Sequence, residues 1–226
     1  HVNNLATGSS YGDMTNGSVA AVLPGGELHQ NLVDYLDEVA DFASTLVDPD
    51  TGKLIPVIYR PWHEHNGDWF WWDTKSTTEG EIRELFRFTV EYLRDVRGVH
   101  NFIYAFSPNG HYENEEEYLY GYPGDEYVDL LGCDVYWDVP ETNPTWFDQL
   151  IKDLRIVVNY ANKTGKVAAL TETGIRWDAS NGLALQDAAY GTQWYTLMRN
   201  AIMEDPIAKQ IAYMLVWRNG GYNHFW

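Results

Sequence analysis

Five short, almost continuously apolar runs divide the sequence, and helical patterns lie between them. The apolar runs are 54–61, 101–108, 130–137, 167–174 and 211–218. Continuous apolarity is typical of parallel strands that are covered on both faces. Helical periodicity recurs at 27–47, 81–97, 145–163 and 187–205, and more weakly at 114–130. Strands and helices that alternate in this way predict βα units, a parallel sheet and an α/β fold.

Turn and breaker residues support these boundaries. Gly98, Gly165 and the pair Asp205-Pro206 predict helix ends, and 48–53 ("DPDTGK") is expected to form a helix-to-strand turn. The sequence shows no linker, repeat or low-complexity tract, so we expect a single domain over residues 1–226. The acidic run 113–117 ("ENEEE") is expected to be a solvated loop or a first helical turn, because acidic residues favour helix N-termini.

Charge and aromatic content narrow the range of partners. The net charge of −18 argues against nucleic acid, whose phosphates would be repelled, and against anionic membrane surfaces. Ten tryptophans and sixteen tyrosines suit a core, a protein interface or the apolar faces of sugar rings. An acidic, Trp-rich chain therefore fits a neutral carbohydrate partner. Cys133 lies in an apolar run and is expected to be a small buried residue.

Two glutamates lie where apolar runs end. Glu64 follows the run 54–61, and Glu172 lies near the end of 167–174. In a (β/α)₈ barrel the C-terminal ends of the strands converge on one face, which holds the active site. Two carboxylates there can hydrolyse a glycosidic bond. A separation of about 5–5.5 Å would give retention of configuration, and roughly 6.5–9.5 Å would give inversion. Alternatively, either glutamate could cap a neighbouring helix.

The residues around Glu64 favour the catalytic interpretation. Within the stretch 59–73 ("YRPWHEHNGDWFWWD"), five Trp and Phe residues follow Tyr59: Trp62, Trp69, Phe70, Trp71 and Trp72. An apolar pocket raises the pKa of a carboxyl group toward the value that a general acid needs. Arg60 could pair with the other carboxylate and hold it ionised. An aromatic stripe is more often core than binding surface, so some of these rings are expected to be core.

The stretch "RPWHEHNGDWFWW" resembles the signature of family 26 of the glycoside hydrolases, best known as β-mannanases, where it ends the fourth strand of a (β/α)₈ TIM barrel. "LTETG" (170–174) is similar to the seventh-strand segment. The resemblance implies that Glu64 is the acid/base and Glu172 the nucleophile of a retaining mechanism that needs no cofactor or metal.

The resemblance also implies a set of substrate-binding residues. "GCDVYW" (132–137) matches the sixth-strand motif, which puts Asp134 and Tyr136 in the site, with Tyr136 beside the nucleophile. His63 and Trp69 match residues that touch the reacting sugar, and Trp217 matches a stacking platform. Trp69, Trp72 and Trp217 are expected to stack on sugar rings, and Arg60 to act beside Glu172. "HVNNLATG" resembles "HxNNPxTG", so His1 would line the site, with Leu5 in place of the usual proline.

The chain is expected to cover only part of that barrel, about strands 4–8 and the preceding helix. A five-strand piece would expose apolar edges, so we expect further polypeptide to complete the barrel. The implied activity is that of an endo-β-1,4-mannanase acting on β-mannan, including galactomannan or glucomannan, in a secreted or cell-surface protein. Alternatives are β-1,3-xylan or mixed-linkage β-glucan as substrates, a non-catalytic carbohydrate-binding barrel, or an inert fragment. His65 and His111 are expected to be surface residues, and Asn66-Gly67 a turn.

Overall fold

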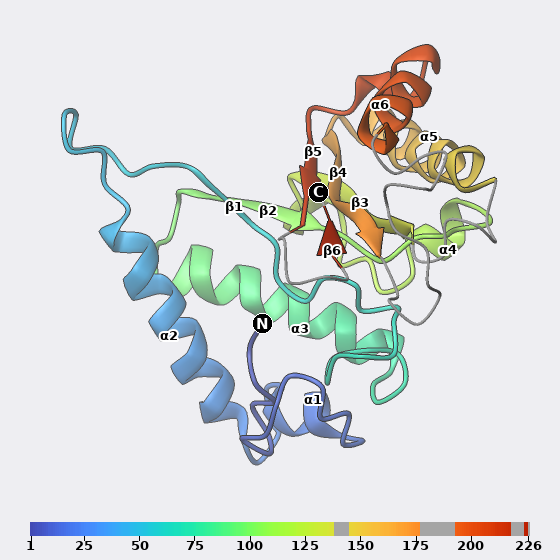
Figure 1. The fold of residues 1–226 in the computed structure, drawn as a ribbon. Coiled ribbons are helices and arrows are strands. Elements are labelled where there is room, and N and C mark those ends of the chain that lie inside the picture. Colours follow the sequence, from blue (N-terminus) through green and yellow to red (C-terminus); the bar gives the residue numbers. More distant parts are fainter. Residues whose placement is uncertain (138–144, 177–192, 218–223, 226) are drawn as a thin grey trace. The chain divides into compact units, whose positions relative to one another are not determined.

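The computed structural model describes residues 1–137, 145–176, 193–217 and 224–225 (Figure 1). This part of the chain forms two compact units. Unit 1 comprises residues 1–106 and 119–129, and unit 2 comprises residues 107–118 and 130–226. This division does not test the expectation of a single domain over residues 1–226, which stays a prediction.

Unit 1 contains a parallel strand pair and three helices. Its elements are α1 (Ser18–Val22), α2 (His29–Thr45), β1 (Val57–Tyr59), α3 (Glu79–Glu91), the π-helical turn η1 (Tyr92–Val96), β2 (Phe102–Phe106) and the 3₁₀ turn η2 (Asp125–Tyr127). Strands β1 and β2 pair in parallel, with Ile58 opposite Ile103. Helix α1 packs against α2 and α3, and α2 also contacts η1.

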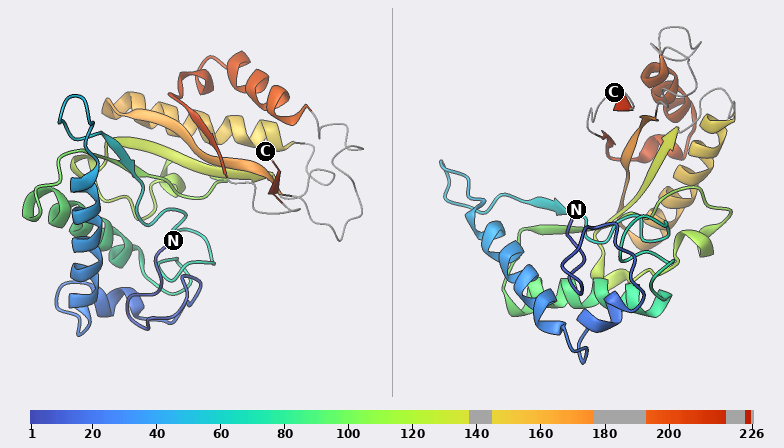
Figure 2. Two further views of the ribbon diagram at one scale, coloured as in Figure 1. Left: turned by 60° about the vertical axis from the view of Figure 1, so that its left-hand side comes forward. Right: turned by 60° about the horizontal axis from the view of Figure 1, so that its bottom comes forward.

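Unit 2 contains the longer strands. Its elements are α4 (Glu115–Tyr118), β3 (Leu130–Trp137), α5 (Trp146–Thr164), β4 (Val167–Arg176), α6 (Trp194–Glu204), the 3₁₀ turn η4 (Ala208–Gln210), β5 (Met214–Val216) and β6 (His224–Phe225). Strand β4 pairs in parallel with β3 and with β5. Helix α5 packs on β3 and β4, and α6 packs on α5 (Figure 2).

Local sequence explains several element boundaries. The side chain of Thr78 accepts the Glu81 N–H, and the Glu81 carboxylate accepts the Thr78 N–H, so a capping box starts α3. Helix α5 ends at Gly165, whose φ of 71° lies in the left-handed region that glycine adopts without strain. Asp48 Oδ1 accepts the N–H groups of Asp50 and Thr51, which forms the predicted turn.

All five predicted strands are present, and the pairs within each unit are parallel as expected. The antiparallel pairing of β6 with β4 was not predicted. Four of the predicted helices are found as α2, α3 with η1, α5 and α6, although the first expected residues of α6, 187–192, lie outside the described part.

The weak helix prediction over 114–130 is wrong. Only Glu115–Tyr118 and Asp125–Tyr127 are helical there. Gly121 and Gly124 have positive φ values of 71° and 118°, and Pro123 between them cannot continue a helix. The acidic run begins α4 instead: Asn114 Oδ1 accepts the Glu117 N–H, and Glu113 and Glu115 pair with lysines on α5. None of the helices in the described residues combines the length and the apolar character needed to cross a membrane.

Candidate active site

In unit 1, Glu64 lies in a tight turn that directly follows β1. Its φ of 53° lies in the left-handed region, which is uncommon for a residue other than glycine. The Glu64 carbonyl accepts the Gly67 N–H at 2.9 Å, which closes the predicted Asn66-Gly67 turn. The Glu64 side chain is largely buried, with 5% of the residue exposed. The strand end thus presents the carboxyl group within an aromatic environment, as the sequence predicted.

Trp69 is the aromatic residue that touches the Glu64 carboxyl group. Its indole Nε1–H donates to Glu64 Oε2 at 2.8 Å. The ring covers Gly67, because a Cβ atom built there would lie 2.6 Å from the ring atom Cζ2. Trp69 is also the most exposed of the five aromatics, at 36%. This exposure leaves it available for the predicted sugar contact, which stays a prediction.

The other tryptophans of the stretch form a buried cluster. Trp62, Trp71 and Trp72 pack edge to face in all three pairings, and Trp62 Nε1–H donates to Thr89 Oγ1. Phe70 stacks on Trp72 with ring centroids 4.4 Å apart, and only 2% of Trp72 is exposed. The stacking of Trp72 on a sugar ring therefore stays a prediction. Trp72 is a core residue that supports the site by donating from Nε1 to the His63 carbonyl.

His63 and His1 lie together beside this cluster. Their rings stack with centroids 5.3 Å apart, and the His1 ring also lies 4.8 Å from that of Phe70. Burial, reinforced by the positive charge of Arg60, holds the pKa of His63 well below its usual range. His63 is thus neutral near pH 7 and can exchange hydrogen bonds with a neutral ligand. The pairing predicted between Arg60 and Glu172 involves both units and stays a prediction.

Asp73 has an unusual environment in the same loop. It has no exposed surface, and its Oδ2 accepts the N–H groups of Trp69 at 2.6 Å and Phe70 at 2.8 Å. Burial is the main reason why the pKa of Asp73 is raised from 3.8 to about 7; the two backbone donors lower it, and the charge of Asp68 raises it. The role of Asp73 was not predictable from the sequence, because an acid that ends an aromatic run resembles an ordinary loop residue.

This raised pKa predicts a pH-dependent stability. Unfolded Asp73 ionises near pH 4, so between about pH 4 and pH 7 the unfolded state increasingly holds the ionised form while the folded state keeps its proton. The free energy of unfolding should therefore decrease over this range, by roughly 4 kcal/mol at most from this group. We expect Asp73→Asn to flatten that decrease in urea unfolding measured from pH 4 to pH 8. Asp68→Asn is the control that should keep most of the decrease, because the charge of Asp68 contributes least to the raised pKa of Asp73. Equal slopes for all three proteins would contradict the assignment.

In unit 2, Glu172 lies on β4 beside Tyr136 on β3. The Tyr136 hydroxyl donates to Glu172 Oε1, which confirms that Tyr136 lies beside the predicted nucleophile. The two residues are 8% and 5% exposed. The Tyr136 ring lies over Gly174, where a Cβ atom would come within 3.2 Å of ring atom Cε1. The glycine of "LTETG" therefore makes room for the ring that holds the carboxylate.

Asp134 pairs in register with Glu172, next to an irregularity between Cys133 and Asp134. It has no exposed surface, and its Oδ1 accepts hydroxyl groups of Ser107 and Thr171, each at 2.7 Å. No part of Asp134 reaches solvent, and its expected substrate contact stays a prediction. Asp134 joins the segment after β2 to the β3–β4 pair and supports the strand segment that bears Glu172. Cys133 is fully buried, as predicted.

Trp217 follows β5 at its C-terminal end. Its N–H donates to the Thr173 carbonyl at 2.9 Å, so its backbone lies beside the residue that follows Glu172. Trp217 is half-buried. The structure thus brings Glu172, Tyr136 and Trp217 together at one end of the β3–β4–β5 sheet, and the stacking role of Trp217 stays a prediction.

Two histidines expected at the surface have structural partners. His65 is buried: its Nε2 lies 2.7 Å from the Tyr120 carbonyl, and burial lowers its pKa to about 4. His111 is partly exposed, with its Nδ1 2.6 Å from Asp153 Oδ2. The sequence could not reveal the burial of His65, because the covering segment 119–129 follows far along the chain.

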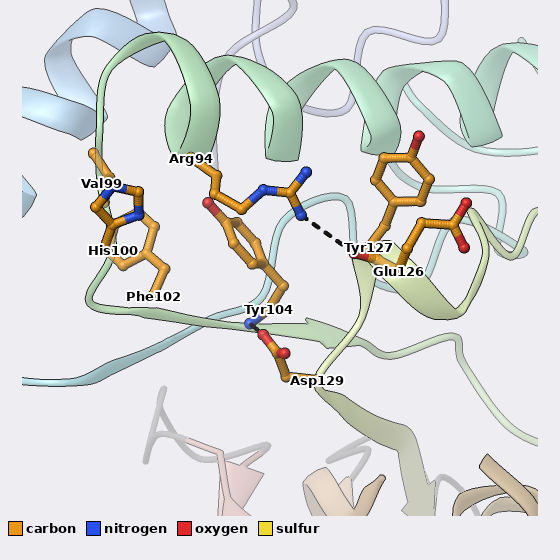
Figure 3. A pocket seen from close by; sticks show the side chains of 8 residues that line it. All are labelled: Arg94, Val99, His100, Phe102, Tyr104, Glu126, Tyr127 and Asp129. Atoms are coloured by element: carbon orange, nitrogen blue, oxygen red, sulfur yellow. Dashed lines mark hydrogen bonds between the residues drawn. The ribbon is translucent and has the colours of Figure 1, made fainter. Parts of the chain in front are cut away.

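Unit 1 also contains a cavity of about 170 Å³ near the beginning of β2 (Figure 3). Figure 3 shows Arg94 reaching across Tyr104 toward the segment of Glu126 and Tyr127. The polar side chains that line the cavity have partners within the protein. Arg94 pairs with Asp95, and the Asp129 carboxylate accepts the Tyr104 N–H. Phe102, the first residue of β2, lines the cavity, whereas Glu64 follows the end of the parallel strand β1. The cavity is therefore distinct from the Glu64 region.

Parallel βα units with glutamates at or after strand ends define a protein of the (β/α)₈ glycosidase class, and comparison with known proteins identifies the family. The model of glycosyl hydrolase family 26 matches residues 3–210. The mannan endo-1,4-beta-mannosidase of Bifidobacterium adolescentis is 37% identical over 233 residues, which span 100% of this chain and 22% of that protein. The chain therefore belongs to glycosyl hydrolase family 26.

Solved structures agree with this assignment. The catalytic domain of the family 26 endo-beta-1,4-mannanase from Bacillus sp. JAMB-750 matches with a TM-score of 0.88 and 44% identity, covering 97% of this chain and 56% of that chain. A double mutant of the Cellulomonas fimi endo-beta-1,4-mannanase has a TM-score of 0.88 and 43% identity, covering 100% and 48%. The chain thus forms part of a (β/α)₈ barrel and spans about half the length of these structures.

Proposed function

We propose that this chain carries the catalytic glutamates of an endo-β-1,4-mannanase that acts with retention of configuration. The observation that carries the proposal is the placement of the two glutamates in a family 26 chain. Each is 5% exposed and accepts a hydrogen bond from an aromatic side chain, Trp69 for Glu64 and Tyr136 for Glu172. Double displacement at an anomeric carbon requires two carboxyl groups that flank the scissile bond, and these contacts hold each carboxyl group in a defined position.

In the first step, the Glu172 carboxylate attacks the anomeric carbon while the bond to the leaving sugar breaks. The protonated Glu64 carboxyl group gives its proton to the departing glycosidic oxygen, so the leaving group departs as a neutral alcohol. The product is a glycosyl ester of Glu172. The hydrogen bond from the Tyr136 hydroxyl orients the Glu172 carboxylate for attack.

In the second step, Glu64 is ionised and acts as a base. It takes a proton from water, whose oxygen attacks the anomeric carbon and displaces the Glu172 carboxylate. Two inversions give net retention, and Glu64 regains the proton that it lost. Because His63 is neutral near pH 7, it can contact sugar hydroxyls without adding charge to the site.

The stereochemical outcome tests this mechanism. Proton NMR during cleavage of mannopentaose should show the β-anomer of the new reducing end first, before mutarotation. First appearance of the α-anomer would indicate inversion and remove Glu172 from the nucleophile role. A protein that binds mannan without releasing reducing ends would instead be a carbohydrate-binding barrel. A binding surface requires the tryptophans but has no need of two buried acids. The presence of both glutamates therefore favours an enzyme.

The substrate within the proposed class is β-mannan, including galactomannan and glucomannan, and relatives named as mannan endo-1,4-beta-mannosidases support it. A second candidate is a β-glucan, because Endoglucanase H of Acetivibrio thermocellus is 33% identical over 126 residues. A reducing-sugar assay on mannan, galactomannan, glucomannan, mixed-linkage β-glucan and β-1,3-xylan separates these substrates. Preference for the glucan or the xylan would overturn the mannan assignment and leave the chemistry intact.

Further polypeptide is proposed to complete the barrel. Ile58 and Ile103 are register partners of β1 and β2, and they are 43% and 37% exposed. Such an apolar pair calls for a covering layer. We expect the 226-residue chain to bind an apolar dye at this face, and a longer natural polypeptide that covers the face to bind less dye. A 226-residue chain that binds no dye would contradict this expectation. Since mannan is a large polymer outside cells, we also propose a secreted or cell-surface location, which fractionation of the source culture would test.

A further inference from the structure

We propose that Asp73 is a positioning residue for the acid/base Glu64, and that it acts through Trp69. This inference rests on the proposed function, because it assigns Asp73 a part in the proton transfer that Glu64 performs there. The assignment follows from two consecutive contacts within unit 1, one between Asp73 and the backbone of Trp69 and one between the Trp69 indole and Glu64.

The first contact fixes the backbone of Trp69. Asp73 Oδ2 accepts the N–H groups of both Trp69 and Phe70, at 2.6 and 2.8 Å. The Asp73 backbone is itself anchored, because its N–H donates to the Phe70 carbonyl and its own carbonyl accepts N–H groups from Ser76 and Thr77. A carboxyl group with no exposed surface and two donors on one oxygen holds these residues in one arrangement.

The second contact transmits this arrangement to the acid. The Trp69 ring lies directly over Gly67, which leaves no room for a side chain there. With its backbone held by Asp73 and its ring lying against Gly67, the indole points Nε1–H at Glu64 Oε2, 2.8 Å away. General acid catalysis depends steeply on where the carboxyl group lies relative to the leaving oxygen. Asp73 therefore contributes to proton transfer without touching the substrate.

The proposal predicts a loss that depends on the leaving group. We expect Asp73→Ala to lower kcat/KM on mannopentaose by about 10- to 100-fold. The variant should keep wild-type kcat/KM on a 2,4-dinitrophenyl β-mannobioside, whose leaving group departs without protonation. Asp73→Asn retains an oxygen acceptor for the two N–H groups and should restore most of the activity. The matched control is Asp68→Asn, which removes an exposed acid paired with Lys75 in the same loop and should leave both rates unchanged.

A double-mutant cycle tests the route through Trp69. Trp69→Phe removes the indole donor, and Asp73→Ala should then have little additional effect on mannopentaose, because the contact that it supports is already gone. Additive losses would overturn the route. An equal loss on both substrates for Asp73→Ala would overturn the positioning role, since general disruption slows every leaving group. If Asp73→Ala fails to fold, Trp69→Phe provides the test. This variant should lose activity on mannopentaose and keep it on the dinitrophenyl substrate. An equal loss on both substrates would refute the role of the Trp69 contact with Glu64.

An NMR measurement separates this inference from the proposed function. The indole N–H resonance of Trp69 is assigned by its disappearance in Trp69→Phe. It should shift in Asp73→Ala and stay in place in Asp68→Asn and Asp73→Asn. A shift in a protein without hydrolase activity would support the contacts and refute the function. An unchanged Trp69 resonance in Asp73→Ala, in a protein whose wild type hydrolyses mannan, would refute the role of Asp73 and leave the proposed function intact.

Discussion

Replacing Glu172 with alanine is expected to abolish mannan hydrolysis, with a loss in kcat of at least about 10⁴-fold. The variant keeps the residues proposed to bind sugar but has no oxygen to attack the anomeric carbon, so the covalent intermediate cannot form. Binding of mannotetraose, measured by calorimetry, should stay detectable. Added azide can occupy the space of the lost carboxylate and attack the anomeric carbon, which would release a glycosyl azide of inverted configuration.

The control for this experiment is Glu115→Ala in the same unit. Glu115 is a surface acid that pairs with Lys163, so its removal should leave turnover unchanged. Appreciable residual hydrolysis by Glu172→Ala would remove Glu172 from the nucleophile role. Loss of oligosaccharide binding together with turnover would point to a disrupted fold, which circular dichroism of the same sample distinguishes.

Replacing Glu64 with alanine is expected to produce a different kinetic pattern. Hydrolysis of mannan should fall by about 10²- to 10⁴-fold, because the glycosidic oxygen then leaves without a proton. The kcat/KM for a 2,4-dinitrophenyl β-mannobioside should stay close to that of the wild type, because dinitrophenolate departs as a stable anion and needs no proton from Glu64. Azide should now yield a glycosyl azide of retained configuration, because it replaces the water that Glu64 activates.

Glu64→Gln serves as the isosteric comparison, because it keeps an oxygen that can accept the Trp69 indole N–H but cannot carry the proton. It should behave like the alanine variant on mannan. If Glu64→Ala lost the activated substrate as severely as mannan, while Glu172→Ala retained it, the roles of the two glutamates would be exchanged. Equal losses on both substrates for both variants would leave neither role supported.

The strands were predictable because each is an apolar run long enough to be buried on both faces. The pairing register of the strands was not predictable. The irregularity between Cys133 and Asp134, which sets Asp134 opposite Glu172, leaves no trace in the local sequence. The helix over 114–130 failed because its acidic and aromatic residues resemble a helical stripe, whereas Gly121, Pro123 and Gly124 impose turns. The π-helical turn that ends α3 also has no distinct pattern.

The two glutamates were recognisable from strand ends and from the family signature, but their supports were harder to see. The sequence did not indicate which tryptophans of this stretch are exposed. Trp69 is the exposed ring and Trp72 is buried. That difference depends on the left-handed turn at Glu64 and on the stacking of Phe70. Asp73 escaped notice, and Gly67 was recognised only as a turn residue, because their contacts with Trp69 exist only in the folded loop.

The left-handed backbone of Trp62 and Glu64 has a consequence for heat inactivation. Each such residue costs about 1–2 kcal/mol relative to an ordinary conformation, and both φ values are 53°. The packing of Trp62 with Trp71 and Trp72 offsets this cost. If that packing loosens on warming, both residues can relax together, and the acid is lost from its place in one cooperative step. Activity should therefore disappear at a lower temperature than the secondary structure of β3, β4 and β5.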